Sequence, residues 1–125
     1  MKKLHVIVLS ASAGLAAGAL FVQALHAQAK PPAYAVAEFE ITDPQVFKEF
    51  SDGNQKGVAA AGGRFIVRRG KTMTIAGEPP KTIAVVAWDN YEQAQAYYAS
   101  DTFKGIAGSR DKGAKFRAFL VETTP

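Results

Sequence analysis

The sequence predicts an α+β domain in which strands and helices follow the order βαββαβ. Segments with the two-residue period of a strand and segments with the period of a helix succeed one another in that order. The predicted strands are residues 34–41, 64–69, 81–88 and 116–122, and the predicted helices are residues 44–61 and 89–100. Two helices covering one face of such a four-stranded sheet give the ferredoxin-like topology.

The first strand and the first helix have the clearest signals. The side chains of residues 34–41 alternate between two faces, so that Phe39 and the small residues two and four positions before it point toward the core and Glu38 points away from it. Residues 42–45, Thr-Asp-Pro-Gln, then begin a helix, because threonine or aspartate can cap it and proline suits its first turn. The glycine pair at 62–63 ends this helix.

In the second strand, residues 64–69, successive side chains are expected to alternate between the two faces of the sheet. On that pattern one face of the sheet receives Phe65 and Val67, and the other receives Arg64, Ile66 and Arg68. Residues 72–76 can extend the strand as a short hairpin arm, and a loop follows at residues 77–80.

The third strand, residues 81–88, is apolar on both faces. Ile83, Val85 and Ala87 lie on one face, and the alternate residues up to Trp88 lie on the other. A strand with two apolar faces is buried on both. Because one layer of helices covers only one face, a partner subunit is predicted to cover the second.

The chain beyond residue 88 is less regular. Asp89 and Glu92 have the spacing of a capping box at the start of the second helix. Phe103 and Ile106 suggest a further short helix within residues 101–115, although the three glycines of that segment weaken it. The last strand is predicted at residues 116–122.

The N-terminus has the pattern of a secretory signal peptide. Two lysines precede an apolar stretch, which ends at residues 27–29, Ala-Gln-Ala, with small residues where a signal peptidase cuts. The sequence thus predicts a leader at 1–29, a linker at 30–32, a domain at 33–122, and a periplasmic or secreted protein that does not touch the membrane after cleavage. The alternative is an uncleaved helix that anchors the chain.

Composition narrows the chemistry of the predicted mature domain. Both histidines, His5 and His26, lie in the leader and the chain has no cysteine. Thiol nucleophiles and histidine triads are therefore excluded, and no cofactor or metal is expected. Without the leader the net charge is +2, with no basic stripe to indicate nucleic acid.

The order of three short motifs resembles a known family, the domain of unknown function 1330. The motifs are Thr42-Asp43-Pro44, Gly62-Gly63-Arg64-Phe65-Ile66-Val67-Arg68, and the set Ala94, Tyr97, Tyr98 and Ser100. The resemblance spans nearly all of residues 33–122. It implies a homodimeric α/β barrel in which two sheets pack face to face, and relatives that include cofactor-free monooxygenases, isomerases, dehalogenase-like enzymes and stress-response proteins.

Candidate site residues follow from the sheet face that the helices leave open. That face is expected to hold Tyr34, Glu38, Glu40, Arg64, Arg68, Trp88 and Arg117. Arg64 would bind a carboxylate or phosphate, and Glu38 would act as general acid or base. The alternative is that these charges pair with one another at the dimer interface.

Four further residues are candidates near the predicted pocket. Tyr97 and Ser100 are expected to border its mouth, where they bind a ligand or cap a helix end, whereas Tyr98 is predicted to belong to the core. Arg110 lies in a glycine-rich segment and is predicted to be a solvated loop charge or part of a lid.

Three functions remain open at this point. The first is an exported or stress-associated domain that holds a small organic or anionic ligand in the dimer cleft. The second is a cofactor-free monooxygenase or isomerase, and the third is a structural dimer without a ligand.

Overall fold

The structure of this protein, a computed structural model, describes residues 29–124. The predicted leader, apart from Ala29, lies outside the described residues, so export and cleavage stay predictions. Among residues 29–124, no helix has the length and apolar character that crossing a bilayer requires.

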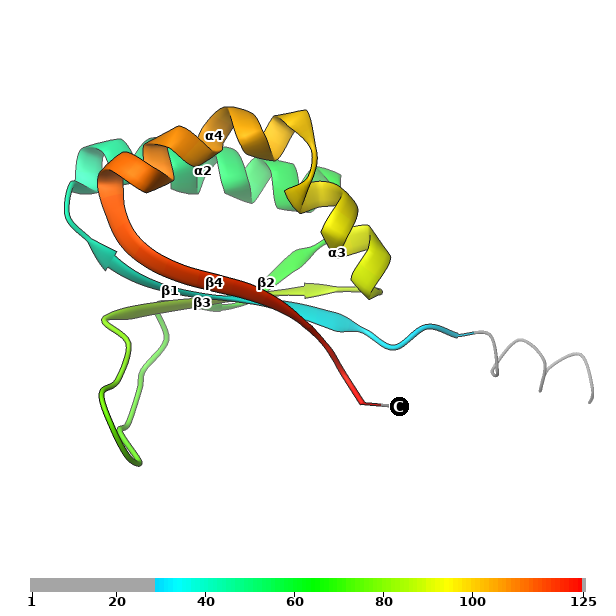
Figure 1. Cartoon of the computed structure of the whole chain (residues 1–125), viewed down its shortest axis with the longest axis horizontal. Helices are drawn as coiled ribbons and strands as arrows, with labels where there is room; N and C mark the ends of the chain where they lie inside the picture. Colours follow the sequence, from blue (N-terminus) through cyan, green and yellow to red (C-terminus); the bar gives the residue numbers. More distant parts are fainter. Residues whose placement is uncertain (1–28, 125) are drawn as a thin grey trace, which may run out of the picture. The chain divides into compact units, whose positions relative to one another are not determined.

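Four strands and three helices make up the domain. In chain order they are β1 (Ala33–Ile41), α2 (Pro44–Ala60), β2 (Arg64–Arg68), β3 (Thr82–Trp88), α3 (Tyr91–Tyr98), α4 (Asp101–Gly113) and β4 (Ala114–Glu122). The strands form one antiparallel sheet in the order β2-β3-β1-β4, and all three helices lie on the same side of it (Figure 1). The predicted α+β ferredoxin-like fold is confirmed: α3 corresponds to the second predicted helix, and α4 corresponds to the further short helix suggested within residues 101–115.

Each helix begins at a residue whose side chain caps it. Asp43 accepts the N–H of Val46 at the start of α2. At the start of α3 the cap is Asn90, which accepts the N–H of Gln93 at 2.8 Å, and not the predicted Asp89. The Gln93 side chain accepts the N–H of Asp89, the residue before the cap, so the predicted capping box between Asp89 and Glu92 is not formed.

The segment 101–113 forms a full helix, α4, despite its three glycines. Ser100 caps it by accepting the N–H of Phe103, and Arg110 and Lys112 lie in its last turn, where positive charge favours a helix. Its last residue, Gly113, contacts the start of α2, because the Gly113 carbonyl accepts the N–H groups of both Thr42 and Asp43. Tertiary packing therefore overrides the weak local propensity.

The second strand contains an irregularity that the alternation did not predict. Phe65 pairs with Val86 but Val67 pairs with Val85, so Ile66 is an extra residue in the strand. Beyond it, Arg68 pairs with Ala84 on the helix-covered face and Val67 lies on the open face. The predicted faces of Val67 and Arg68 were therefore wrong.

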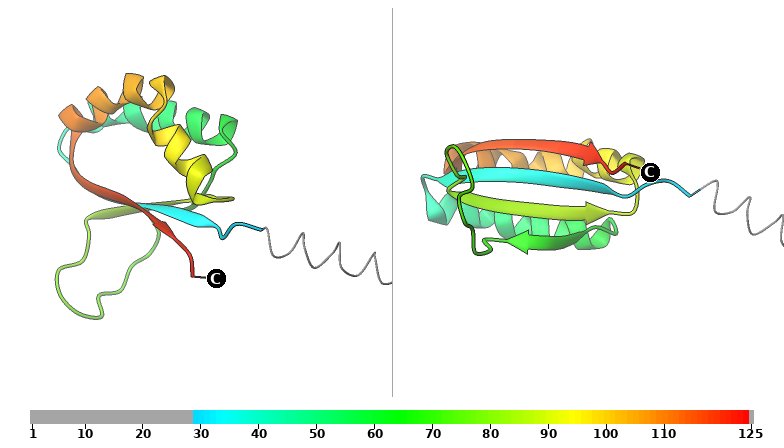
Figure 2. Two further views of the ribbon diagram at one scale, coloured as in Figure 1. Left: turned by 45° about the vertical axis from the view of Figure 1, so that its right-hand side comes forward. Right: turned by 90° about the horizontal axis from the view of Figure 1, so that it is seen from below.

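A long connection, residues 69–81, joins β2 to β3. It contains no strand, so the predicted hairpin arm at 72–76 is not formed. It projects to the side of the sheet opposite the helices (Figure 2), and Met73 and Ile75 on it are almost fully exposed.

The core has two parts, both between the sheet and the helices. One lies beneath α3 and contains Trp88, which is 1% exposed, packed with Val58, Ala94 and Tyr97. The other contains Phe39, Phe47, Phe50 and Ala114 at the opposite end. The space between these two parts is where the cavity described below lies.

Candidate functional site

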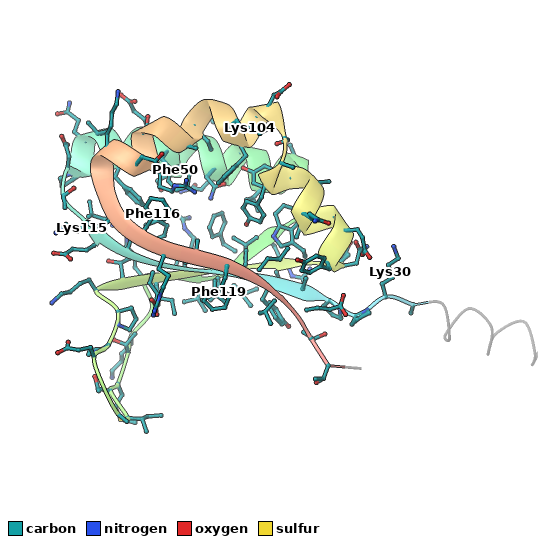
Figure 3. The ribbon with its side chains drawn as sticks, in the orientation of Figure 1. Lys30, Phe50, Lys104, Lys115, Phe116 and Phe119 are labelled. Atoms are coloured by element: carbon teal, nitrogen blue, oxygen red, sulfur yellow. The ribbon has the colours of Figure 1, made fainter. Side chains whose placement is uncertain are left out.

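A cavity of about 870 Å³ lies between the helices and the sheet. Aromatic rings from β1, β2, α2, α3 and α4 line it, and small residues such as Ala37 and Ala84 form its floor on the sheet. Figure 3 shows Phe50 and Phe116 between the helix layer and the sheet, whereas Phe119 lies on the far side of the sheet. The ring-bearing lining residues on the covered side are Phe39, Phe47, Phe50, Phe65, Tyr98 and Phe103.

Arg110 is the charged group most deeply placed in this cavity. Its side chain is only 18% exposed. The guanidinium carbon lies 4.0 Å from the centre of the Phe116 ring, 5.5 Å from that of Phe103 and 5.8 Å from that of Phe50. Neither role predicted for Arg110, a solvated loop charge or a lid, fits this position. The spacing of Phe103, Ile106 and Arg110 on one helical face was the signal that could have placed it.

Arg68 also lines the cavity, because the irregularity at Ile66 turns it to the covered face. Its guanidinium carbon lies 5.2 Å from the centre of the Phe65 ring. The sequence placed Arg68 on the open face, so its position is corrected while a ligand-binding role stays a prediction.

Of the two adjacent tyrosines of α3, Tyr97 lies in the core and not at the pocket mouth, whereas Tyr98 packs against the core and also reaches the cavity. Tyr97 is 4% exposed and donates a hydrogen bond to Asn54 of α2 at 2.8 Å. Tyr98, predicted as core, lines the cavity. Burial, and then the neighbouring Tyr98, raises the pKa of Tyr97 to about 12, and burial also raises the pKa of Tyr98. Both phenols therefore stay protonated at neutral pH and can donate hydrogen bonds.

Trp88 and Ser100 serve the fold where the sequence predicted ligand contacts. Trp88 pairs with Ala33 and packs against Tyr97 and Tyr98 beneath α3, so its predicted place on the open face was wrong. Ser100 caps α4 and donates to the Tyr97 carbonyl at 2.6 Å, which is the capping alternative stated for it.

Tyr34, Arg64 and Glu38 lie on the open face of the sheet, as predicted. Tyr34 and Arg64 flank Ala87 in one row across the strands. Glu38 lies elsewhere on that face and accepts a hydrogen bond from Arg117 Nε at 2.8 Å. The structure therefore brings Glu38 into the arginine pairing that was the alternative to catalysis.

Between these two polar groups the open face is apolar. Val67, Val85, Val36 and Phe119 form one row across all four strands, and the Phe119 side chain is 53% exposed. Helices do not cover this row, whose four side chains all face away from them. An apolar row of this kind is what an interface uses.

Acidic groups are scarce in the cavity. Asp52 is the one carboxylate among its lining residues. Its side chain is 52% exposed and forms a salt bridge with Lys48, one helical turn earlier. Within residues 29–124, histidine, cysteine and carboxylate side chains nowhere form a group of three that could hold a metal ion.

Comparison with known families decides what kind of domain this is. The model of the family described as Domain of unknown function (DUF1330) matches residues 32–124. The chain belongs to this family. The match covers every strand and helix of the described domain, and no curated protein matches the chain.

Solved structures show the same fold as this DUF1330 domain at low sequence identity. A protein of unknown function from Rhodopseudomonas palustris has a TM-score of 0.61 and 9% identity, over 85% of this chain and 92% of that one. A dimeric ferredoxin-like protein of unknown function from Thermobifida fusca has a TM-score of 0.51 and 13% identity, over 75% and 92%. SnoaB, a cofactor-independent oxygenase from Streptomyces nogalater, has a TM-score of 0.50 and 12% identity, over 76% and 95%.

Proposed function

We propose that this DUF1330 domain binds a small, largely apolar organic molecule in the cavity between its helices and its sheet. The observation that carries the proposal is the cavity itself, about 870 Å³ and lined by aromatic rings from five elements. Ligand sites in proteins have volumes of roughly 300–1,000 Å³ and combine apolar walls with a few polar groups. The proposed site thus lies within one subunit, and not in the dimer cleft that the sequence suggested.

A cofactor-free enzyme is the alternative function, and it has less support. Such an enzyme needs a base whose pKa lies near the working pH. The phenol of Tyr98 stays protonated because burial raises its pKa, and Asp52 is half exposed and paired with Lys48. The likeness to SnoaB, at 12% identity, concerns the fold. Binding without chemistry therefore fits the cavity better.

We also propose that two copies of the domain pack their open sheet faces together. The apolar row that contains Phe119 supports this, because its side chains would be removed from water. The proteins from Thermobifida fusca and Bacteroides fragilis with this fold are described as dimeric. The leader pattern supports a further proposal, that the domain acts outside the cytoplasm.

Binding of a neutral fluorescent dye tests the proposed function. The full-length gene product, purified as the cell processes it, is titrated with N-phenyl-1-naphthylamine, whose emission rises in apolar surroundings. We expect saturable binding of one dye per subunit. Ala37→Phe, which fills the floor of the cavity, should abolish binding, whereas Ala96→Phe, on the exposed side of α3, should retain it.

Two results would refute this function. One is the absence of saturable binding by the unaltered protein. The other is equal dye affinity for the Ala37→Phe and Ala96→Phe variants, which would place the dye on the surface. Circular dichroism and the melting temperature of each variant establish that the comparison is made between folded proteins.

A further inference from the structure

We propose that the cavity selects organic anions, and that Arg110 is the residue that binds the anionic group. The ligand class is a flat aromatic or conjugated molecule that carries a carboxylate, a sulfonate or a similar oxygen anion. This inference rests on the proposed function, since it concerns the same cavity, and it adds the chemistry of the ligand.

The aromatic rings fix the orientation in which Arg110 can act. With its central carbon 4.0 Å from the Phe116 ring centre, the guanidinium covers the face of that ring. The N–H groups of a guanidinium lie in its own plane and form a rigid fork of donors. An oxygen anion approaching in that plane meets donors with the fork geometry that carboxylates and sulfonates fit.

Arg110 also retains unused donors. A guanidinium has five N–H donors. Nε and Nη2 donate to Asp111 Oδ1, both at 3.2 Å, which leaves three donors for which no described residue supplies an acceptor. Asp111 is 57% exposed, so water weakens this pairing. Arg110 is thus a largely buried cation whose remaining N–H donors can bind an anion in the cavity.

The charges around the cavity have the same sign as Arg110. Arg68 and Arg69 line it together with Arg110, and Asp52 is the single carboxylate among the lining residues. Asp52 is compensated by Lys48. The cavity therefore carries an excess of positive charge in a partly desolvated space, where attraction to an anion is stronger than in water.

A purely structural role for Arg110 is the competing explanation. On that account the guanidinium only stacks on the rings and fastens α4 to β4. It predicts that removing the charge lowers stability and changes the affinity for neutral and anionic ligands alike. The two accounts therefore differ in the selectivity for charge, which can be measured apart from stability.

Two dyes with one aromatic skeleton separate these accounts. N-phenyl-1-naphthylamine is neutral, and 8-anilino-1-naphthalenesulfonate is the same skeleton with a sulfonate. We expect Arg110→Met to weaken sulfonate dye binding by about tenfold to a hundredfold, the range of a charge-assisted hydrogen bond. Affinity for the neutral dye should change by less than about twofold, because methionine preserves apolar contacts with the rings.

Lys104→Met is the matched control variant. It removes one positive charge from the same helix, but Lys104 is exposed on the side of α4 that faces away from the sheet (Figure 3). We expect it to leave the affinities for both dyes unchanged. Arg110→Lys should retain part of the preference for the sulfonate, because it keeps the charge and loses the fork of donors.

The outcomes distinguish this inference from the function on which it rests. If neither dye binds, the proposed function fails. The anion proposal is overturned if the neutral dye binds and Arg110→Met either lowers the affinities for the neutral and the sulfonate dye by the same factor or changes neither affinity. The proposed binding function stands in that case.

A competition with the unaltered protein covers the case in which Arg110→Met does not fold. 2-Naphthoate should displace the neutral dye at a concentration at least tenfold lower than 2-naphthamide does, since the two differ only in the anionic group. Equal potency of the two competitors would also overturn the proposal.

Discussion

Replacing Gly113 by alanine should destabilise the domain, because α4 ends in direct contact with the start of α2. A Cβ atom at Gly113 would lie 2.6 Å from the backbone nitrogen of Phe47 and 2.8 Å from its Cα, whereas ordinary contact begins at 3.4 Å. The two helix ends must therefore separate by about 0.8 Å. The hydrogen bonds from Thr42 and Asp43 to the Gly113 carbonyl, 2.9 and 3.0 Å long, are strained by the same movement.

The expected cost follows from the kind of atoms that clash. Overpacking a filled site costs roughly 1–3 kcal/mol, and backbone atoms cannot move aside as a flexible side chain can. Gly105 and Gly108 are matched controls in the same helix, because a Cβ at either meets no atom within 4 Å. Alanine at those positions should stabilise the helix by about 0.5–1 kcal/mol.

Urea unfolding followed by circular dichroism, at one fixed protein concentration, measures the three variants. Opposite signs are expected, with Gly113→Ala less stable and Gly108→Ala at least as stable as the unaltered protein. If Gly113→Ala matches Gly108→Ala, the contact between α4 and α2 is not as close as described, and the position of Arg110 above the cavity must be reconsidered.

Three more predictions concern the tyrosine pair and the open face. Because burial raises the pKa of Tyr97 from 10.0 to about 12, its contribution to stability is complete below pH 10 and is lost as the pH rises to 12. Urea titrations at several pH values should show that this loss, at most about 3 kcal/mol, is smaller in Tyr97→Phe, where only the raised pKa of Tyr98 remains. Phe119→Glu should give monomers in sedimentation at concentrations where the unaltered protein is dimeric, since a carboxylate on the apolar row would be buried without a partner. Glu38→Gln should leave the affinity for the dye unchanged, because Glu38 lies on the open face and pairs with Arg117. The same change should lower the stability of the dimer by about 1 kcal/mol or less. Loss of dye binding would show that Glu38 belongs to the ligand site.

The order of the elements could be predicted because each was specified by strong local signals. The cap and proline at Asp43 and Pro44, the glycines at 62–63 and the alternation of β1 do not depend on the rest of the fold. The fold class followed from that order alone. The boundaries of the strands and of α2 differ from the predicted ones by at most two residues.

The face of the sheet that each residue occupies was harder to predict. Both faces of β3 are apolar, so alternation does not say which one the helices cover; pairing with Ala33 turns Trp88 toward them. In β2 a single extra residue, Ile66, exchanges the faces of all residues after it. Neither the pairing partner nor the irregularity is visible in a local pattern, and these two errors account for the misplaced Trp88 and Arg68.

The cavity was missed because its main polar residue lies in a segment with weak local signals. Glycines at 105, 108 and 113 lower helix propensity, yet Gly113 is what allows the close contact with Phe47. The same residue type thus weakened the prediction of α4 and makes its packing possible. Once α4 is accepted as a helix, Arg110 falls on the face of Phe103 and Ile106.

The two proposed functions of this domain, ligand binding and dimerisation, use opposite faces of one sheet. In β1 and β4, residues facing the helices, such as Ala37 and Leu120, line the cavity, and the residues between them form the open face proposed for dimerisation, although Val36 and Phe119 of that face also border the cavity. Successive side chains of a strand point to opposite faces, so the face that a residue occupies depends only on whether its position in the strand is odd or even. In β2 the extra residue Ile66 changes that parity, so that one short strand supplies Arg64 to the open face and Arg68 to the cavity. Deleting Ile66 should therefore return Arg68 to the open face and reduce the positive charge of the cavity, which makes this irregularity part of the proposed anion selectivity.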